Sequence, residues 1–322
     1  MALTIDIANE NNKYDVLIVG GGVAALTSAI YCQRAGLKTG FFEFNVPGGK
    51  IVNNPSIENV PSYKMVNGAD LAYATFEHAT KLGANYLYGK VTSIVNKQEY
   101  FLLYTEDGQI WQSDVVIIAS GTVNSKLNVP GEEEYLFKGI SQCAVCDGSL
   151  TRGKEVLVVG GGSSAFSESL HLSSIADKIY LIHRSENFSA EQILIDKLKA
   201  KQNVVIIPNT EVVSFKGNDN SLEQVELINN KTNEKSIMNL QHAFIYVGSK
   251  ANTDFVPNDL KLDENKYIIA NCGMETNING MYAAGDCVKK SENQIITSMS
   301  DGAIASMRAV NYIEKKRNGI KG

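Results

Sequence analysis

The same pattern of a short apolar strand followed by three glycines occurs twice in this chain. It runs through Asp15–Val19 to Gly20–Gly22, and again through Glu155–Val159 to Gly160–Gly162. An apolar helical stretch follows each glycine run, and a second apolar strand follows each helix. Strand, glycine turn, helix and strand in this order are typical of a dinucleotide-binding unit. The chain is therefore expected to contain two such units.

Two strand endings indicate how these units are connected. The predicted strand Asp114–Ala119 ends in a Ser-Gly-Thr turn, and the strand Ala243–Val247 ends in Gly-Ser. Both endings are typical of exits from one domain into another, so we expect the second unit to be inserted into the first. The prediction is an α/β fold of two Rossmann-like, three-layer dinucleotide-binding domains. The first comprises residues 1–121 and 249–322, and the second comprises residues 122–248.

Further strand signals lie between the glycine turns and after the second one. Segments rich in β-branched and aromatic residues are expected to be antiparallel additions to the two domains: Val91–Val95, Tyr100–Thr105, Val204–Ile207 and Val212–Phe215. Near the chain end, a short strand from Gly280 leads to Gly285 and Asp286, and a helix is expected from about Ile295. These C-terminal elements would complete the first domain.

Length and charge limit the possible functions. The chain has 322 residues and a formal net charge of -5, and 44% of its residues are hydrophobic. Such a length usually gives two domains, and the acidic balance argues against a nucleic acid or an anionic membrane as partner. Glycines interrupt the uncharged stretch from Val16 to Gln33, which disfavours a membrane span. The polar N-terminus contains no signal peptide, so we expect a cytoplasmic location.

The first glycine turn has the spacing of a pyrophosphate-binding loop. In Gly20-x-Gly22-x-x-Ala25, the first glycine permits a tight turn, the second lets the backbone approach a pyrophosphate, and the small third residue lets the helix pack closely. Glu43 ends the second strand, where it is placed to accept hydrogen bonds from ribose hydroxyls. These features together predict a nucleotide site.

The second glycine turn differs at the position of the acid. It reads Gly160-x-Gly162-x-x-Ala165, but the residue that matches the acid is His183, and Arg184 follows it. A guanidinium can pair with a 2′-phosphate that a carboxylate would repel, so this site favours NADP over NAD. The alternative is that Arg184 is an ordinary surface arginine and the unit binds its nucleotide loosely or not at all.

Cys143 and Cys146 form the only pair at Cys-x-x-Cys spacing, and Asp147 follows them. This spacing lets both sulfurs meet in an easily exchanged disulfide. An adjacent carboxylate can move the protons that thiol chemistry requires. No second Cys/His pair at ligand spacing accompanies them, so redox chemistry is favoured and no metal site is predicted.

The other cysteines and most histidines receive no role. Three cysteines stand alone and are interpreted as small buried hydrophobic side chains: Cys32, Cys272 and Cys287. Three histidines have no partner at catalytic spacing: His78, His171 and His242. The redox chemistry is therefore expected in a single cysteine pair.

Longer motifs follow one another along the chain: Asn128–Glu132, Ser141–Gly148, Gly160–Ala165, Met281–Asp286 and Gln294–Thr297. Together they resemble the low-molecular-weight thioredoxin reductase family over nearly the whole length. The resemblance implies an FAD domain made of both chain ends, an inserted domain of pyridine-nucleotide type, and a homodimer. It also implies that Cys146 takes electrons from the flavin, that Cys143 attacks the protein disulfide, and that Asp147 is the acid-base group.

The resemblance further implies an FAD site. Asp286, next to Gly285, would hold the ribityl chain, and Gln294 and Ile295 would approach the isoalloxazine ring. Three further residues would line the FAD pocket: Gly49, Lys50 and Asn59. In the inserted domain, Ser164 falls within the nucleotide motif. The family alternates between two domain orientations, and the hinges are expected near Thr122 and Ser249.

The inserted domain departs from the family pattern. Ser185 and Ser189 stand where arginines are usual, and Ser167 stands where a glutamate is usual. In the first domain, Lys50 replaces the usual glutamine. Each missing arginine removes a charge-assisted contact worth roughly 1.5 to 3 kcal/mol, which weakens the binding of NADPH. The electron donor is therefore left open among NADPH, ferredoxin, NADH and another donor.

The leading hypothesis is a thioredoxin-disulfide reductase that passes electrons from NADPH through FAD and the Cys143–Cys146 disulfide to thioredoxin. One alternative is the same reductase with ferredoxin or another donor. A second is a redox-sensing flavoprotein with little turnover. A ferredoxin-NADP reductase is disfavoured because enzymes of that type generally lack the cysteine pair.

Overall fold

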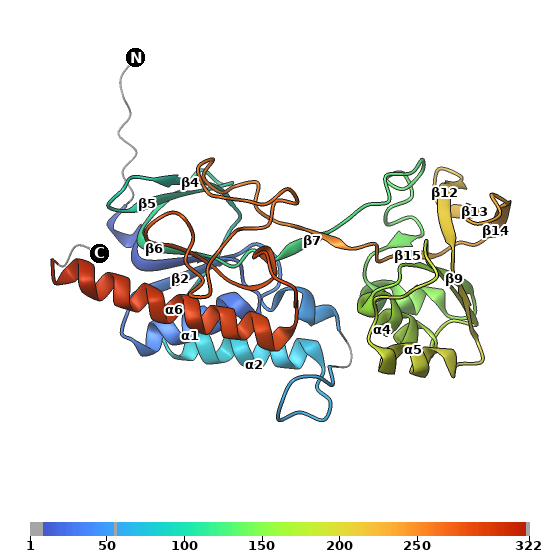
Figure 1. Cartoon of the computed structure of the whole chain (residues 1–322), viewed down its shortest axis with the longest axis horizontal. Helices are drawn as coiled ribbons and strands as arrows, with labels where there is room; N and C mark the ends of the chain where they lie inside the picture. Colours follow the sequence, from blue (N-terminus) through green and yellow to red (C-terminus); the bar gives the residue numbers. More distant parts are fainter. Residues whose placement is uncertain (1–8, 55–56, 320–322) are drawn as a thin grey trace, which may run out of the picture. The chain divides into compact units, whose positions relative to one another are not determined.

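The computed structural model describes residues 9–54 and 57–319 and divides into two compact units (Figure 1). Unit 1 comprises Met1–Val123 and Lys250–Gly322, and unit 2 comprises Asn124–Ser249. The chain passes from one unit to the other in β7 (Thr122–Asn124) and β16 (Ser249–Ala251), which pair as a two-stranded ladder. Unit 2 is therefore an insertion between the two segments of unit 1.

Unit 1 is built on a seven-stranded mixed sheet of order β3-β2-β1-β6-β5-β4, with β17 paired to β6. The strands are β1 (Lys13–Val19), β2 (Thr39–Glu43), β3 (Asn85–Tyr88), β4 (Val91–Asn96), β5 (Phe101–Thr105), β6 (Ile110–Ile118) and β17 (Met281–Ala283). β3, β2, β1, β6 and β17 are parallel, whereas β5 and β4 add antiparallel strands at one side. The expectation for the β4–β5 region is confirmed.

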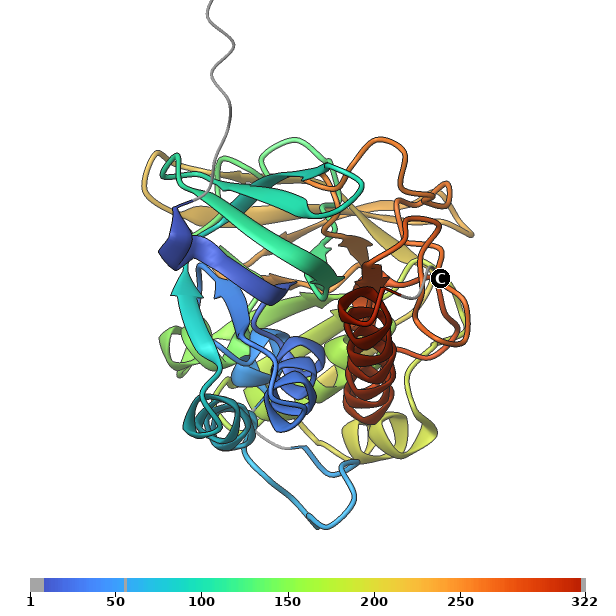
Figure 2. The same ribbon diagram turned by 90° about the vertical axis from the view of Figure 1, so that its left-hand side faces the viewer.

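Three helices cover one face of this sheet: α1 (Val23–Arg34), α2 (Gly68–Lys81) and α6 (Ile295–Arg317). Figure 2 looks along them and shows α1 between α2 and α6. Successive strand residues point to opposite faces. Val16 and Ile18 accordingly join the core beneath α1 and α6, and Leu17 and Val19 join the core on the other face. Burial of both faces explains why β1 reads as a continuous apolar run.

α6 packs closely on α1 because small residues face each other. A Cβ on Gly302 would lie 2.3 Å from the Ala24 carbonyl oxygen, and the Ser28 hydroxyl bridges the helices by donating to the Gly302 carbonyl at 3.2 Å. The helix begins with a capping box formed by Gln294 and Thr297. The close approach of Gly302 to Ala24 places the N-terminal half of α6 against the start of α1.

Unit 2 repeats the arrangement with a five-stranded parallel sheet of order β11-β10-β9-β15-β8. Its strands are β8 (Ile140–Ser141), β9 (Glu155–Val159), β10 (Lys178–Ile182), β11 (Val204–Ile207) and β15 (Ala243–Ile245). α4 (Ser163–Leu172) and α5 (Gln192–Lys199) pack on one face, and on the other lies an antiparallel sheet of β12 (Thr210–Gly217), β13 (Leu222–Asn229) and β14 (Lys235–Asn239). The expected α/β class with two Rossmann-like units is confirmed.

One strand prediction is wrong. Val204–Ile207 was expected to be antiparallel, but β11 pairs in parallel register with β10, from Ile179 opposite Val204 to Ile182 opposite Ile207. α5 precedes β11 and carries the chain back across the sheet, and such a crossover returns the next strand parallel to the last. Composition alone does not distinguish the two orientations.

The isolated cysteines also differ from one another. Cys32 and Cys287 are buried as expected, but Cys272 is exposed. Cys272 lies in a turn in which the Asn271 side chain accepts hydrogen bonds from the backbone N–H groups of Gly273 and Glu275. Among residues 9–54 and 57–319, no helix is long and apolar enough to cross a membrane.

Candidate active site

The first glycine turn connects β1 to α1 in unit 1. Gly20 has φ of 118°, and a Cβ there would lie 2.3 Å from the Ala119 carbonyl oxygen, so only glycine fits. Gly22 is the N-cap of α1 and provides no side-chain cap. A Cβ on Gly22 would meet no protein atom within 4 Å. The first N–H groups of α1 therefore face open space beside Gly22, and Ala25 is fully buried behind them.

Glu43 lies beside this turn at the end of β2. Its Oε2 accepts a hydrogen bond from the Gly21 N–H at 3.0 Å, and its Oε1 accepts from the Asn45 N–H at 2.7 Å. These bonds hold the carboxylate next to the glycine turn. The acid predicted from sequence spacing thus lies at the turn it was expected to serve.

The segment after β2 returns to the same turn. Gly48 donates from its N–H to the Gly21 carbonyl at 2.7 Å, and a Cβ on Gly49 would lie 3.1 Å from Gly22 Cα. The 3-10 helix η2 (Gly49–Asn53) begins here. Lys50 follows, and its Nζ donates to the Thr122 hydroxyl at 2.6 Å.

Lys50 is also within electrostatic reach of Asp286. Burial of the ammonium group lowers the pKa of Lys50, and the Asp286 carboxylate opposes that shift. Asp286 lies in the 3-10 helix η4 (Gly285–Cys287), and its Oδ1 accepts a hydrogen bond from the Ser298 hydroxyl at 3.0 Å. An ideal Cβ on Gly285 would lie 2.9 Å from the Ala24 Cβ, so η4 lies against the beginning of α1.

Asn59 and Gln294 meet although they are far apart in the sequence. The Asn59 amide nitrogen donates to Gln294 Oε1 at 3.0 Å. Ile295, the first residue of α6, follows directly and packs against a small buried cluster that includes Ile57 and Leu71. Segments from both ends of the chain therefore contribute to the surroundings of the first glycine turn.

These surroundings fit FAD. Uncapped N–H groups at the start of α1 suit a pyrophosphate, and the space above Gly22 lets one approach the backbone. Polar groups from η2 and η4 lie nearby. The donors are neutral N–H groups, hydroxyls and one ammonium, and the acceptors include two carboxylates, a combination that suits a nucleotide.

The second glycine turn has the same backbone geometry. Gly160 has φ of 152°, and a Cβ there would lie 2.3 Å from the Tyr246 carbonyl oxygen. Gly162 is the N-cap of α4, again without a side-chain cap, and Ala165 is fully buried. The nearest atom to a Cβ on Gly162 would be Ser189 Oγ at 3.6 Å. This turn can also receive a phosphate group.

His183 occupies the place that Glu43 occupies in unit 1. A Cβ on Gly161 would lie 2.5 Å from the imidazole ring, so the ring covers the turn. Burial lowers the pKa of His183, and the nearby Arg184 guanidinium lowers it further. His183 Nε2 also lies 2.9 Å from the Ser185 hydroxyl. Both effects favour the neutral form of the ring.

The segment that follows β10 is tied to the turn by neutral groups. Ser189 donates from its N–H to the Gly161 carbonyl at 2.9 Å, and Glu191 donates from its N–H to the Ser163 hydroxyl at 3.1 Å. Arg184 in this segment and Ser164 on α4 are both exposed. Glu186 pairs with Lys231 at 2.5 Å, which places a carboxylate in the segment as well.

Cys143 and Cys146 form a disulfide at the four-residue helix α3 (Ala144–Asp147). Cys143 is the N-cap, and its Sγ accepts from the Cys146 N–H at 3.1 Å. Cys143 is half-buried and Cys146 is exposed. The expected pairing of these two cysteines is present.

Asp147 is held by Ser141 at the end of β8. The Ser141 hydroxyl donates to Asp147 Oδ2 at 2.6 Å, and Ser141 Oγ accepts from the Cys143 N–H at 3.1 Å. His242 also lies in electrostatic reach of Asp147, and its Nε2 is 2.9 Å from Lys154 Nζ. Burial and Lys154 both lower the pKa of His242.

Two residues near the disulfide were missed by sequence reasoning. The Tyr246 hydroxyl oxygen accepts a hydrogen bond from the Ala144 N–H at 3.1 Å. The Glu168 carboxyl lies close to the same N–H, and its Oε2 is buried without a hydrogen-bond partner among the described residues. Burial raises the pKa of Glu168 to about 7. No local motif marks either residue, because they reach α3 from α4 and from the end of β15.

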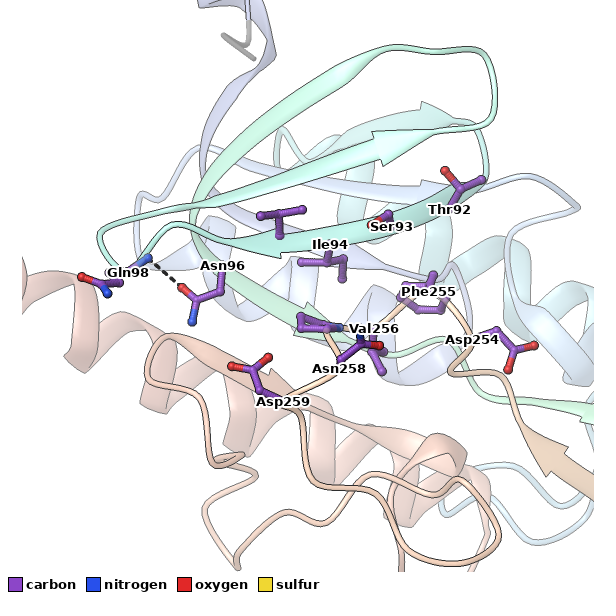
Figure 3. A pocket seen from close by; sticks show the side chains of 12 residues that line it. Thr92, Ser93, Ile94, Asn96, Gln98, Asp254, Phe255, Val256, Asn258 and Asp259 are labelled. Carbon is purple, nitrogen blue, oxygen red and sulfur yellow. Dashed lines mark hydrogen bonds between the residues drawn. The ribbon is translucent and has the colours of Figure 1, made fainter. Parts of the chain in front are cut away.

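A separate cavity of about 580 Å³ lies in unit 1 between β4 and the segment 254–259 (Figure 3). Ile94 bonds to this segment by donating from its N–H to the Phe255 carbonyl at 3.1 Å. Asp254 and Asp259 make one side of the cavity acidic. It contains none of the predicted site residues, so the cavity is distinct from the glycine turn and from the disulfide.

Comparison with known proteins agrees with this geometry. Residues 14–302 match the model of the family described as pyridine nucleotide-disulphide oxidoreductase. The chain belongs to this family. Family membership makes it an FAD-dependent oxidoreductase and implies the use of FAD and NADPH.

Relatives cover almost the whole chain. The thioredoxin reductase of Listeria monocytogenes is 36% identical over 98% of this chain and 98% of its own. The crystal structure of Lactococcus lactis thioredoxin reductase is 37% identical, covers 94% of this chain and 99% of its own, and gives a TM-score of 0.92. A ferredoxin-flavin thioredoxin reductase from Clostridium acetobutylicum is 29% identical over 95% of this chain and 99% of its own, with a TM-score of 0.53.

Proposed function

We propose that this protein is a thioredoxin-disulfide reductase that passes electrons from NADPH through FAD and the Cys143–Cys146 disulfide to thioredoxin. The observation that carries the proposal is the disulfide itself, which lies beside Asp147 in a unit of nucleotide-binding type. The curated relatives that match nearly the full chain are named thioredoxin reductases. Both findings support a protein disulfide as the substrate.

In this proposal FAD binds to unit 1. The residues proposed to hold it are Gly20, Gly22, Ala25, Glu43, Gly49, Lys50, Asn59, Gly285, Asp286, Gln294 and Ile295. Support comes from the N–H groups at the start of α1 and from the contacts that join η2, η4 and α6 to that region. When bound, FAD supplies an electron pair to the disulfide.

The proposed disulfide exchange uses three side chains of unit 2. The Cys143–Cys146 bond breaks on taking up two electrons and one proton, which leaves one thiol and one thiolate. Cys143, as a thiolate, then attacks the thioredoxin disulfide and forms a mixed disulfide, and one thioredoxin sulfur leaves. Cys146 attacks Cys143 in turn, which releases reduced thioredoxin. Asp147, held by Ser141, takes and returns the proton at these steps.

NADPH is proposed to bind to unit 2 through Gly160, Gly162, Ser164, Ala165, His183 and Arg184. Arg184 is the only arginine in the segment that follows β10. Ser185 and Ser189 favour a second candidate, the same reductase with ferredoxin as donor, because a phosphate would find two hydroxyls where arginines are usual. A relative named ferredoxin-flavin thioredoxin reductase supports that candidate.

Anaerobic titration of the purified protein separates the donors. Bleaching of the flavin absorption is followed with NADPH, with NADH and with reduced ferredoxin, and thioredoxin reduction is measured with the same three donors. Fast bleaching by micromolar NADPH followed by thioredoxin turnover supports the leading proposal. Bleaching by ferredoxin alone would assign the second candidate. If the flavin is reduced but none of the three donors supports thioredoxin turnover, the reductase proposal is contradicted and the redox-sensing flavoprotein is the alternative that is left.

We further propose that the protein is a cytoplasmic homodimer whose units change orientation about β7 and β16 during turnover. The chain passes from unit 1 to unit 2 once and returns once, and the two passages pair as the short β7–β16 ladder. These two connections support the position proposed for the hinges. Sedimentation velocity measures the dimer directly, and a monomer at micromolar concentration would contradict it. Hydrogen exchange during turnover tests the hinges, since rigid segments 122–124 and 249–251 would exclude them.

A further inference from the structure

The segment 143–147 of unit 2, called the redox loop below, lies against the partly buried carboxyl group of Glu168. The proposed chemistry does not use this carboxyl group. Glu168 lies on α4, which packs against α3, and its Oε2 is buried without a hydrogen-bond partner among the described residues. A buried carboxylate oxygen without a partner is costly, whereas a protonated carboxyl is tolerated there. Burial therefore favours the neutral carboxyl group more at Glu168 than at an exposed glutamate, and it raises the pKa of Glu168 to about 7.

Glu168 meets the redox pair through the backbone of Ala144, the residue directly after Cys143. The Ala144 N–H favours the charged form of Glu168 and also donates to the Tyr246 hydroxyl oxygen at 3.1 Å. Burial raises the pKa of Tyr246, and the nearby carboxylates of Glu168 and Asp147 raise it further. Tyr246 thus lies within electrostatic reach of both carboxyl groups.

We propose that Glu168 is a positioning residue of the redox loop, which orients the Ala144 N–H together with Tyr246 and takes up a proton when the Cys143–Cys146 disulfide is reduced. The inference rests on the proposed function, because it concerns the same disulfide. Reduction brings two electrons to the sulfurs, and at neutral pH one of them becomes a thiolate. Its negative charge disfavours a second negative charge nearby, so Glu168 binds one proton from solvent as the thiolate forms.

The other charged groups around Glu168 leave this assignment intact. The elements packed against α4 are α3, α5, β9 and β10, and the segment after β10 joins them through Phe188, whose ring lies 5.1 Å from that of Phe166. The titratable or charged residues of these parts, with His171 of α4 itself and Tyr246, are Asp147 of α3, Asp196, Lys197 and Lys199 of α5, Glu155 of β9, Lys178 and Tyr180 of β10, and His183, Arg184, Glu186 and Glu191 of the segment after β10. The pKa of Glu168 is raised by burial of its carboxyl, and the Ala144 N–H opposes that rise.

The test compares the holoenzyme with its Glu168→Gln variant in dithiothreitol redox buffers from pH 6 to pH 9. The reduced fraction of Cys143–Cys146 is read by acid quenching, alkylation and peptide mass spectrometry. Each protein gives an equilibrium constant for reduction of the disulfide at every pH. We expect the ratio of the wild-type constant to the variant constant to fall roughly three- to tenfold as pH rises across this range. The reason is that ionised Glu168 repels the new thiolate at high pH, whereas a glutamine carries no charge. Glu234→Gln, at an exposed turn of the same unit, should follow the wild type.

Parallel pH curves for the wild type and Glu168→Gln would overturn the proposal. If that variant does not fold, infrared difference spectra of the wild type provide an independent test. Reduction at pH 7.5 should increase the carbonyl band of a protonated carboxyl, and the increase should persist in Asp147→Asn. No increase would overturn the assignment. These readouts use a small dithiol, so they remain valid even if thioredoxin proves not to be the substrate.

Discussion

The two glycine turns have nearly the same backbone but different neighbours. In each, a Cβ on the first glycine would lie 2.3 Å from a carbonyl oxygen of the adjacent strand end, Ala119 in unit 1 and Tyr246 in unit 2. The position at the end of the second strand is occupied by Glu43 in unit 1 and by the imidazole ring of His183 in unit 2. We therefore propose that the shared backbone provides a nucleotide site in each unit, and that the neighbouring side chains select which nucleotide binds.

The largest expected effect separates the chemistry of unit 2 from that of unit 1. Cys143→Ser removes the attacking sulfur, so thioredoxin reduction should fall by at least about a thousandfold, as expected for loss of a nucleophile. Flavin reduction by the donor should persist, since unit 1 is unchanged. Stopped-flow absorbance and a thioredoxin-coupled assay measure the two steps. Loss of both steps together would contradict this separation.

The next effect distinguishes the two turns through matched glycine substitutions. In Gly22→Ala the new Cβ meets no protein atom within 4 Å, so the free energy of unfolding should change by less than about 1 kcal/mol. The methyl group would occupy the approach to the pyrophosphate, and FAD affinity should fall at least about tenfold. Denaturant unfolding of the apoprotein and flavin titration measure these quantities.

Gly162→Ala is the counterpart in unit 2. Its Cβ would make an ordinary contact with Ser189 Oγ at 3.6 Å, so the fold should tolerate it. FAD content should be unchanged, while nicotinamide affinity should fall. If Gly22→Ala retains FAD, or if Gly162→Ala loses it, the assignment of one nucleotide to each turn is wrong.

A third substitution tests the serines of unit 2. Ser185→Arg should strengthen NADPH binding by roughly ten- to a hundredfold, because a charge-assisted hydrogen bond contributes about 1.5 to 3 kcal/mol. NADH binding should change little, since it lacks the 2′-phosphate. Isothermal titration with both nucleotides measures the difference, and Ser236→Arg on an exposed strand is the control. An equal gain for NADPH and NADH would show that Arg at this position does not contact the phosphate.

The smallest expected effect concerns pH. The pKa of His183 is lowered in the folded state, so the unfolded chain binds the proton more readily as pH falls below about 6.5. Stability should therefore fall from pH 7 to pH 5, and His183→Gln should lessen that fall slightly. Urea unfolding at pH 5, 6 and 7 provides the measurement. The same pH dependence in both proteins would mean that the ring is not held neutral over the turn.

The regular parts of both units could be predicted because burial leaves a simple pattern. β9 begins and ends at the predicted residues, since a strand buried on both faces is continuously apolar and is bounded by glycine or polar residues. The cysteine pair could be predicted because its two members are close in sequence.

Other features could not be predicted, since they depend on the tertiary fold. The direction of β11 follows from the crossover through α5. Tyr246 reaches Ala144 across 102 residues, and Glu168 joins them from a different helix. Their chemistry arises from burial, and neither residue has a local sequence signature. Cys272 is exposed because a turn, rather than a strand or helix, contains it.

The most direct test of the central claim is to trap the exchange intermediate. In Cys146→Ser the resolving sulfur is absent, so a thioredoxin disulfide attacked by Cys143 should remain attached as a mixed disulfide. Peptide mass spectrometry after alkylation identifies the linked cysteines. The account predicts a link between Cys143 and thioredoxin that is absent in Cys143→Ser. No trapped complex, or a link only to the exposed Cys272, would contradict the claim that Cys143–Cys146 delivers electrons to thioredoxin.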